Sequence, residues 1–317
     1  MKRALTAVIG VITLIGLTAC GQAGSSAEPG KSSTSQGCTT AAPIGSLPGK
    51  AGTITIGSAN FPESELLADL YGQAMKAQGV TVTFHHNIGA RATYLPALEQ
   101  GSIGMVPEYT GAMLNFLNPD NKTRQPDQVY QELRTWAGCR AMTVTDKAPA
   151  EDVDTVTVTR ATAKKYKIKT LADLAPIAGK LSIGAPSEFR DSLNGTAGLK
   201  RDYNLTFGRF VSLSPSGSIT QTALRKGTVD AADIFSTDPS IAKYGYVQLA
   251  DPKRAFGSEN VVPLFRRDVL TQPMADGTNA VSDKLTTAAL TELNQQVAQG
   301  KQSDAVAEEW LKKNGIV

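Results

Sequence analysis

The chain has 317 residues, of which 41% are hydrophobic, 19% charged and 6% aromatic, and its formal net charge is +3. A normal apolar share with balanced charge excludes a disordered chain, and so small a positive charge excludes an electrostatic surface for nucleic acid. The two histidines, His85 and His86, are adjacent, which excludes a multi-histidine metal site, while the length suits two lobes of ordinary size.

The first residues have the layout of an export signal. Lys2 and Arg3 precede an apolar run over residues 4–17, which is too short and too abruptly ended for a transmembrane helix; a buried helix or a true membrane anchor is the alternative. The run ends in Leu-Thr-Ala-Cys20, which resembles the lipobox of bacterial lipoproteins, whose cysteine becomes the lipidated first residue. We therefore predict a signal peptide over residues 1–19 and acyl chains on Cys20 that hold the protein at the outer face of the cell membrane.

A flexible tether is expected over residues 20–50, which are rich in Gly, Ser, Thr, Ala and Pro and cannot bury a core. Cys38 lies within it. With Cys20 lipidated, Cys38 and Cys139 remain, and an exported protein can oxidise them. We expect a Cys38–Cys139 disulfide that pins the tether to the globular body, with two free thiols as the alternative.

The body begins with an alternation of strand and helix patterns. The sequence predicts a buried strand at residues 54–58, a helix at 64–78, a strand at 80–84, a helix at 94–100 and a strand near 103–107. The helix at 64–78 carries apolar residues three and four positions apart and is closed by a glycine. This order is typical of a parallel sheet covered by helices.

The same pattern recurs in the second half of the chain. Residues 182–185 echo residues 55–58, and residues 223–229 match residues 97–103 at nearly the same offset. Both matches lead to an aromatic residue followed by a hydroxyl residue. The spacing predicts two similar α/β lobes.

Two lobes require connections between them, which we expect near residues 143–158 and 247–262. The C-terminal segment would then complete the first lobe. It carries two amphipathic helix patterns, one from Leu285 to Val297 and one that we expect Ser303 to cap.

Strand ends predict where a ligand binds, because ligands of open parallel α/β sheets lie outside the carboxyl ends of the strands. Ser58 and Asn60 follow the first strand of one lobe, and Ser187 follows that of the other; nearby helix N-termini favour an anionic or carbonyl group. Tyr109 and Phe235 follow the third strand of each lobe, so we expect both rings to approach one cleft. Burial in the two cores is the alternative.

No motif of a known catalytic site is present, neither a nucleophile elbow, a dinucleotide fingerprint, a P-loop nor a zinc-protease helix. Glu63 and Glu65 are best interpreted as acidic residues that stabilise the first turn of a helix. Thr93 follows a loop that the repeat places at the cleft, where it contacts the ligand or caps a helix. We therefore predict a non-catalytic chain without cofactor or metal.

Several short motifs resemble the osmoprotectant-binding proteins of bacterial ABC importers, the ProX/OpuC type, and in particular its actinobacterial ProX-like branch. The motifs are residues 57–63, 107–111, 223–227 and 235–238. The similarity runs from about residue 52 to the C-terminus.

The resemblance implies a type II periplasmic-binding fold, an α/β architecture of two lobes, each a sheet flanked by helices, joined by two hinge crossovers. Lobe 1 would comprise residues 51–150 and 255–317, and lobe 2 residues 151–254. The resemblance further implies that the protein captures glycine betaine, choline, carnitine or a related solute. It would deliver the solute to a membrane permease whose ATPase is a separate chain. We expect a monomer that binds no nucleic acid.

In the better-known members of that family, four tyrosines enclose the quaternary ammonium group of the ligand. By resemblance, Tyr109 keeps its tyrosine and Phe235 keeps the ring but not the hydroxyl. The other two positions fall on Val156 and near Glu259, where no aromatic residue stands. The tyrosine cage is therefore incomplete.

The carboxylate-binding side departs from the family pattern too, since the expected arginine falls near Ser192. We expect Arg190 to contact the ligand carboxylate, Glu259 to contact the cation, and Asp238 to stand behind them. A non-betaine ligand such as a polyol, a sugar or a polyphenol remains the alternative. An extracytoplasmic enzyme or a sensor lipoprotein on the same fold is a further alternative.

Overall fold

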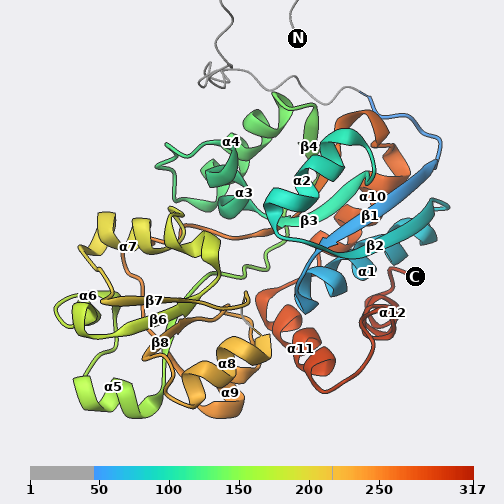
Figure 1. Ribbon diagram of the computed structural model, residues 1–317. Helices are drawn as coiled ribbons and strands as arrows, with labels where there is room; N and C mark the ends of the chain where they lie inside the picture. Colours follow the sequence, from blue (N-terminus) through green and yellow to red (C-terminus); the bar gives the residue numbers. More distant parts are fainter. Residues whose placement is uncertain (1–45, 216) are drawn as a thin grey trace, which may run out of the picture. The chain divides into compact units, whose positions relative to one another are not determined.

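The computed structural model describes residues 46–215 and 217–317, all of which belong to one compact unit (Figure 1). Their strands form two sheets of five, in the orders β2-β1-β3-β10-β4 and β7-β6-β8-β5-β9. The first sheet contains β1 (Thr53–Ala59), β2 (Thr81–Gly89), β3 (Met105–Tyr109), β4 (Met142–Val144) and β10 (Val261–Arg266). The second contains β5 (Val156–Val158), β6 (Ser182–Ala185), β7 (Arg209–Ser212), β8 (Ala231–Asp233) and β9 (Val247–Gln248).

Helices accompany each sheet and define two lobes. The first lobe has α1 (Pro62–Ala77), α2 (Arg91–Gln100), α3 (Thr110–Leu117), α4 (Pro126–Gly138), α10 (Gln272–Ser282), α11 (Thr287–Ala298), α12 (Ser303–Lys313) and the 3-10 turn η3 (Arg267–Val269). The second has α5 (Arg160–Tyr166), α6 (Leu171–Leu174), α7 (Thr196–Tyr203), α8 (Gly217–Arg225), α9 (Ser240–Tyr244), η1 (Ala178–Lys180) and η2 (Ser187–Arg190). Helices α10 and α12, from the end of the chain, pack against α1 near its start (Figure 1).

The predicted alternation of strands and helices is present in both lobes, and so is the predicted repeat. In the first sheet β1 lies between β2 and β3, and in the second β6 lies between β7 and β8. Each set of three strands runs parallel. The predicted parallel sheet is confirmed for these strands, and each sheet adds an antiparallel strand that was not predicted, β10 beside β3 and β5 beside β8. Each of these strands arrives from the other lobe and so enters its sheet from the opposite direction. The two-lobe fold class is confirmed.

Hydrophobic side chains explain why these segments fold as they do. Ile54 and Ile56 alternate along β1 and are buried, and Leu66, Leu70 and Tyr71 form part of the fully buried stripe of α1. That stripe packs with the C-terminal helices, since Leu290, Val306 and Leu311 belong to the same core. A second core fills the second lobe. The C-terminal segment is thus held to the first lobe by burial of apolar surface.

Two crossovers connect the lobes, from β4 to β5 and from β9 to β10, and they pair with each other. Glu151 and Asn260 form an isolated antiparallel bridge. The amide of Asp152 donates to the carbonyl of Glu259 at 3.1 Å, and the amide of Val261 donates to the carbonyl of Ala150 at 3.0 Å. This pairing makes a two-stranded hinge whose side chains face the space between the sheets.

Several expectations concern the ends of elements or the chain's cysteines. Helix α12 begins at Ser303, but its cap is Gln302, and the Ser303 hydroxyl instead donates to Asp69 at 2.6 Å. The prediction that Ser303 caps this helix is therefore wrong. Cys139, which follows α4, is disulfide-bonded; Cys20, Cys38 and the signal segment lie outside the described residues, so pairing with Cys38 stays a prediction. Within the described part of the chain, no helix is long and apolar enough to span a membrane.

Candidate functional site

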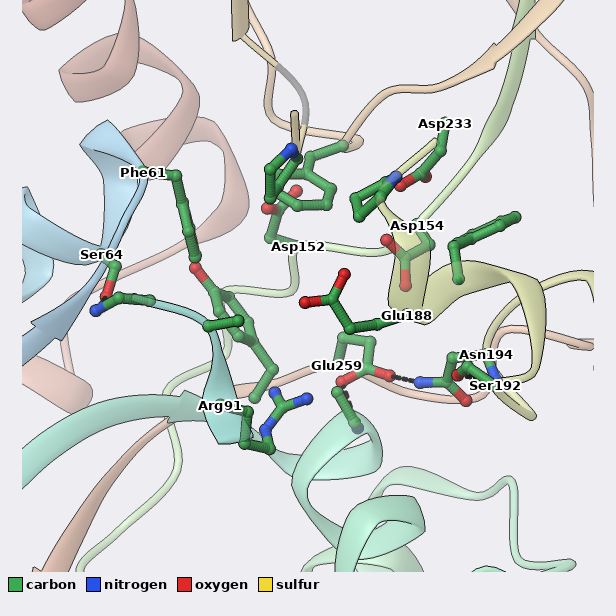
Figure 2. Close-up of a pocket in the computed structure, with 18 of the residues that line it drawn as sticks. Phe61, Ser64, Arg91, Asp152, Asp154, Glu188, Ser192, Asn194, Asp233 and Glu259 are labelled. Carbon is green, nitrogen blue, oxygen red and sulfur yellow. Dashed lines mark hydrogen bonds between the residues drawn. The ribbon is translucent and has the colours of Figure 1, made fainter. Parts of the chain in front are cut away.

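A cavity of about 200 Å³ lies between the lobes, where the carboxyl ends of β1 and β3 face the ends of β6 and β8 (Figure 2). Pockets for drug-sized ligands have volumes of roughly 300–1,000 Å³, so this cavity suits a small solute. Both lobes and both crossovers line it. The lining residues include Asn60, Phe61, Arg91, Tyr94, Tyr109, Asp152, Asp154, Glu188, Phe189, Ser192, Asn194, Asp233, Phe235 and Glu259.

Three aromatic rings meet on one side of the cavity. Phe61, the residue before α1, lies with its ring centre 6.4 Å from that of Tyr109, and the two planes differ by 27°. Its centre lies 5.6 Å from that of Phe235, which comes from the second lobe, and those rings meet edge to face. The predicted approach of Tyr109 and Phe235 is therefore mediated by Phe61, which the sequence reasoning did not select.

The hydroxyl of Tyr109 is used inside the protein. It donates to Oε1 of Glu63 at 2.5 Å, and Oε2 of Glu63 accepts from the Thr237 hydroxyl at 2.6 Å and from Asn294. Glu63 is 5% exposed, and burial raises the pKa of its carboxyl. Glu63 lies in the first turn of α1, as expected, and its side chain in addition ties α1 of the first lobe to Thr237 of the second. Tyr109 is left with only its ring to offer a ligand.

Arg91 is the only cationic side chain that lines the cavity within the described part of the chain. Its Nε and Nη2 atoms donate to the two oxygens of buried Glu108 at 2.8 and 2.9 Å, and Tyr94 donates to the same carboxylate at 2.5 Å. Nη1 makes no hydrogen bond to the described residues. The bidentate pair fixes the guanidinium plane and leaves this third nitrogen for a ligand oxygen.

Carboxylates outnumber the single cation. Glu259 accepts from the amide of Ala112 at 2.8 Å and from the side-chain amide of Asn194. Asp152 accepts from the amide of Thr237 at 3.0 Å. Glu188, Asp154 and Asp233 complete the acidic lining. Burial raises the pKa of Asp152, Asp233 and Glu259, so their ionised forms are costly in the empty cavity. A cationic group on the ligand favours those ionised forms.

Asn194 joins the lobes at the edge of the cavity. It lies in the loop after η2 of the second lobe and is 4% exposed. Its Nδ2 donates to Glu259 of the second crossover, and its Oδ1 accepts from Asn115 of α3 in the first lobe. The loop that carries Asn194 therefore closes the cavity against the first lobe.

Asp154 and Asp233 are two acidic residues of the cavity that form no ion pair with a cation of the described chain. Burial raises the pKa of Asp154 to about 6, although its side chain keeps contact with the cavity. The pKa of Asp233, which is 1% exposed, is raised well above its usual range by burial and then by the charge of Asp154. Ionisation of these two carboxyls lowers the stability of the fold. Their position at the cavity indicates a role in ligand binding instead.

We predict that Asp154→Asn stabilises the unliganded protein at pH 7.5 but not at pH 4. A carboxyl whose folded pKa exceeds the unfolded value of about 3.9 stabilises the fold fully below that value and loses the contribution as pH rises towards 6. Removing the charge should restore on the order of 1–2 kcal/mol at pH 7.5 after allowance for solvent screening. Thermal unfolding at both pH values measures the difference. An equal gain at pH 4 would contradict the ionisation argument.

The structure brings four of the nine predicted ligand residues to the cavity, namely Asn60, Tyr109, Phe235 and Glu259. Arg190 is not among them, because η2 turns its guanidinium over the ring of Phe210, at 4.6 Å from the ring centre. Arg91 occupies the position that we expected of Arg190.

The other predicted residues are used elsewhere. Ser58 is fully buried, where its hydroxyl accepts from the amide of Asn87 at 2.8 Å and donates to the carbonyl of Ala59. Thr93 is exposed in the first turn of α2, which has no side-chain cap. Ser187 is exposed and donates to Glu188. Asp238 accepts from Gln221 and from the amide of Ser240, and it lines a separate cavity.

Sequence signals existed for some residues that were missed. Phe61 lies inside the motif at residues 57–63, and Arg91 lies in the loop from which Thr93 was chosen. Asp233 interrupts the apolar run Ala-Ala-Asp-Ile at a strand, and a charge in a buried strand is itself a sign of function. Asp152 and Asp154 lie within the predicted crossover, whose side chains the sequence alone did not orient.

Comparison with known proteins agrees with this geometry. A sequence profile described as the substrate-binding domain of the ABC-type glycine betaine transport system matches residues 52–313. The chain is 26% identical over 285 residues to the glycine betaine-binding protein YehZ of Escherichia coli, which covers 85% of this chain and 93% of that protein. It is 24% identical over 281 residues to the carnitine transport binding protein OpuCC of Listeria monocytogenes, which covers 85% of this chain and 90% of that protein.

Solved structures support the fold. A glycine betaine/carnitine/choline ABC transporter protein superposes with a TM-score of 0.67 at 24% identity and covers 83% of this chain and 99% of its own. A choline-binding protein in complex with choline has a TM-score of 0.59 at 16% identity and covers 83% of this chain and 89% of its own. The profile describes ligand-binding domains rather than enzymes, which confirms the expectation of a non-catalytic chain. The chain belongs to the family of substrate-binding domains of ABC-type glycine betaine transport systems.

Proposed function

We propose that this protein captures a small solute with a positive charge next to a carboxylate, the class of glycine betaine and carnitine, and delivers it to a membrane permease. The observation that carries the proposal is the composition of the cavity. Aromatic rings from both lobes stand beside an excess of carboxylates, and one guanidinium group lies in reach. The names of the relatives, which include glycine betaine-binding and carnitine-binding proteins, support the same class.

The two ends of such a ligand have complementary partners. A ligand carboxylate suits Nη1 of Arg91, which Glu108 holds in place. The cationic end suits the faces of Phe61, Tyr109 and Phe235, since an aromatic face attracts a cation. Contacts to both lobes then favour the closed form, which the paired crossovers reach by rotation.

The permease would recognise the closed form, and a separate ATPase chain would drive import. A relative from Helicobacter pylori whose name joins an ergothioneine transport permease to a binding protein supports work beside a permease; this chain is 24% identical to it over 271 residues and covers 47% of its length. We propose in addition a lipid anchor at Cys20 and a Cys38–Cys139 disulfide. The mass of the mature protein, alkylated without reductant, tests both: the expected result is acylated Cys20 and no alkylated thiol.

The ligand class is tested by thermal unfolding in the presence of single solutes. Glycine betaine, carnitine and dimethylglycine represent the proposed class, choline represents a cation without a carboxylate, and a polyol and a sugar represent neutral solutes. At 100 times its dissociation constant, a ligand should stabilise the folded chain by about 2.7 kcal/mol. We expect at least one charged solute and no neutral solute to raise the Tm. A shift only with neutral solutes would exclude the proposed class.

A further inference from the structure

Asp233 is a buried carboxylate without a hydrogen bond of normal geometry, at the wall of the cavity. Its side chain is 1% exposed, and neither Oδ1 nor Oδ2 makes a hydrogen bond of normal geometry to the described residues. The side chain of Asp154 and the backbone of Thr155 lie near enough to shift its pKa. A buried polar group that lacks a partner carries a desolvation penalty, so native proteins rarely keep one without a use. Figure 2 shows its oxygens beside Asp154, on the wall of the same cavity.

Asp154 supplies the second carboxylate of this pair. It comes from the first crossover, whereas Asp233 ends β8, and their carboxyls are close enough that each alters the titration of the other. Two like charges at this separation in a desolvated site do not both ionise readily; one proton shared between them relieves the repulsion. The empty cavity therefore favours a pair that holds a proton.

The surroundings add charge of the same sign. Charged and titratable groups line the cavity around the pair or adjoin its lining, with Arg91 as the single cation among the described residues. They are Glu63, Glu108, Asp152, Glu188, Glu259, Tyr94 and Tyr109. Arg91 already makes a bidentate pair with Glu108. Burial raises the pKa of Asp154 and the charge of Arg91 lowers it in part, but no cation of the described chain forms an ion pair with Asp154 or Asp233. A ligand can supply one.

We propose that Asp154 and Asp233 together form a subsite for a ligand cation that carries N–H donors, and that the pair releases a shared proton to solvent when such a cation binds. This deepens the proposed function and rests on it in one respect, the entry of a small cationic solute into this cavity. A quaternary ammonium group has no N–H and leaves both oxygens of Asp233 without a hydrogen bond. A tertiary ammonium supplies one N–H to one of these oxygens, and a less substituted ammonium or a guanidinium supplies one to each.

Two matched ligand pairs test the N–H requirement. Dimethylglycine differs from glycine betaine by one N–H in place of one methyl, and dimethylethanolamine differs from choline in the same way. In each pair we expect the N–H ligand to bind at least about tenfold more tightly, which is about 1.4 kcal/mol, because hydrogen bonds between charged groups are stronger than neutral ones. Isothermal titration gives both dissociation constants.

The same titrations, repeated at pH 6 in two buffers of different ionisation enthalpy, count the protons released. We expect between about 0.5 and one proton per N–H ligand bound, and a dissociation constant that rises by up to about tenfold per pH unit as the pH falls below 6. Protonation competes with the cation for the pair, which sets the direction of this change.

Asp154→Asn and Asp233→Asn should each remove the N–H preference and the proton release, because an amide presents its own N–H groups to the cation. Glu309→Gln removes one charge on α12, in a side chain that is 69% exposed and pairs with Lys301 at the surface, and it should leave both readouts unchanged.

The proposal requires that the wild-type chain bind the N–H ligand of each pair more tightly and release a proton on binding it. Absence of either result overturns the proposal. Glycine betaine that binds as tightly as dimethylglycine, without proton release, overturns the subsite and leaves the proposed function standing. Binding of a polyol or sugar with no binding of any of the four charged solutes overturns both.

Discussion

Replacing Gly195 with alanine is expected to abolish tight ligand binding and to lower the Tm. Gly195 ends the loop after η2 and precedes α7. A Cβ atom there would lie 1.9 Å from the carbonyl oxygen of Phe189 and 2.7 Å from its carbonyl carbon. Both are backbone atoms, so no change of rotamer relieves the contact, and the loop that carries Glu188 and Asn194 into the cavity must move.

The expected loss of stability is about 3 kcal/mol or more, at the upper end of what overpacking causes. For a body of this size that corresponds to a Tm lower by roughly 6–12 °C. Gly179→Ala is the matched control in the same lobe, because a Cβ at Gly179 has no heavy atom within 4 Å; its effect should stay within about 0.5 kcal/mol. If Gly195→Ala kept the wild-type Tm and affinity, the loop would not be held as described.

Phe235→Ala is expected to weaken binding of the cognate cationic solute by at least about tenfold, since a desolvated cation–π contact contributes about 2 kcal/mol and each 1.4 kcal/mol is a factor of ten. Phe235 belongs to the second lobe, yet its ring meets Phe61 of the first at 5.6 Å between centres. The substitution therefore removes a contact to the ligand together with a contact that holds the lobes closed. Titration calorimetry on the purified variant measures the change.

Phe116→Ala provides the matched control for loss of a phenyl ring. Phe116 is 43% exposed on α3 and does not line the cavity. The Phe116→Ala variant should therefore bind the solute with the affinity of the wild type. Tyr109→Phe should also bind nearly as the wild type does, because the hydroxyl points to Glu63 and the ring remains. Equal affinities of Phe235→Ala and the wild type would exclude a role for this ring in binding.

The sequence predicted the architecture well because hydrophobic period and turn residues are local properties. The stripe of α1 and the alternation of β1 are readable from a few residues each. The repeat also placed Tyr109 and Phe235 correctly at the cavity, since equivalent strands end at equivalent points. Antiparallel β10 and β5 escaped prediction, because strand direction depends on which lobe the chain comes from.

The site was predictable only in part, because side-chain direction at a strand end depends on the next turn. Arg190 was two residues from the expected position, and a single 3-10 turn sent it to Phe210 instead of the cavity. Arg91 was passed over for its neighbour Thr93, which the first turn of α2 directs to solvent. A rotation of about 100° per helical residue separates such neighbours, and spacing alone does not fix its starting angle.

By itself the sequence determined two α/β lobes, a chain without catalytic motifs and a shortage of aromatic residues for a tyrosine cage. Only the tertiary structure decided what takes the place of that cage. It brought Phe61 between Tyr109 and Phe235, and it left Asp154 and Asp233 close together without an ion pair to a cation of the described chain. The physical reason is that desolvation and charge coupling depend on distances between residues far apart in the chain. Those distances exist only when the two crossovers have brought the lobes together.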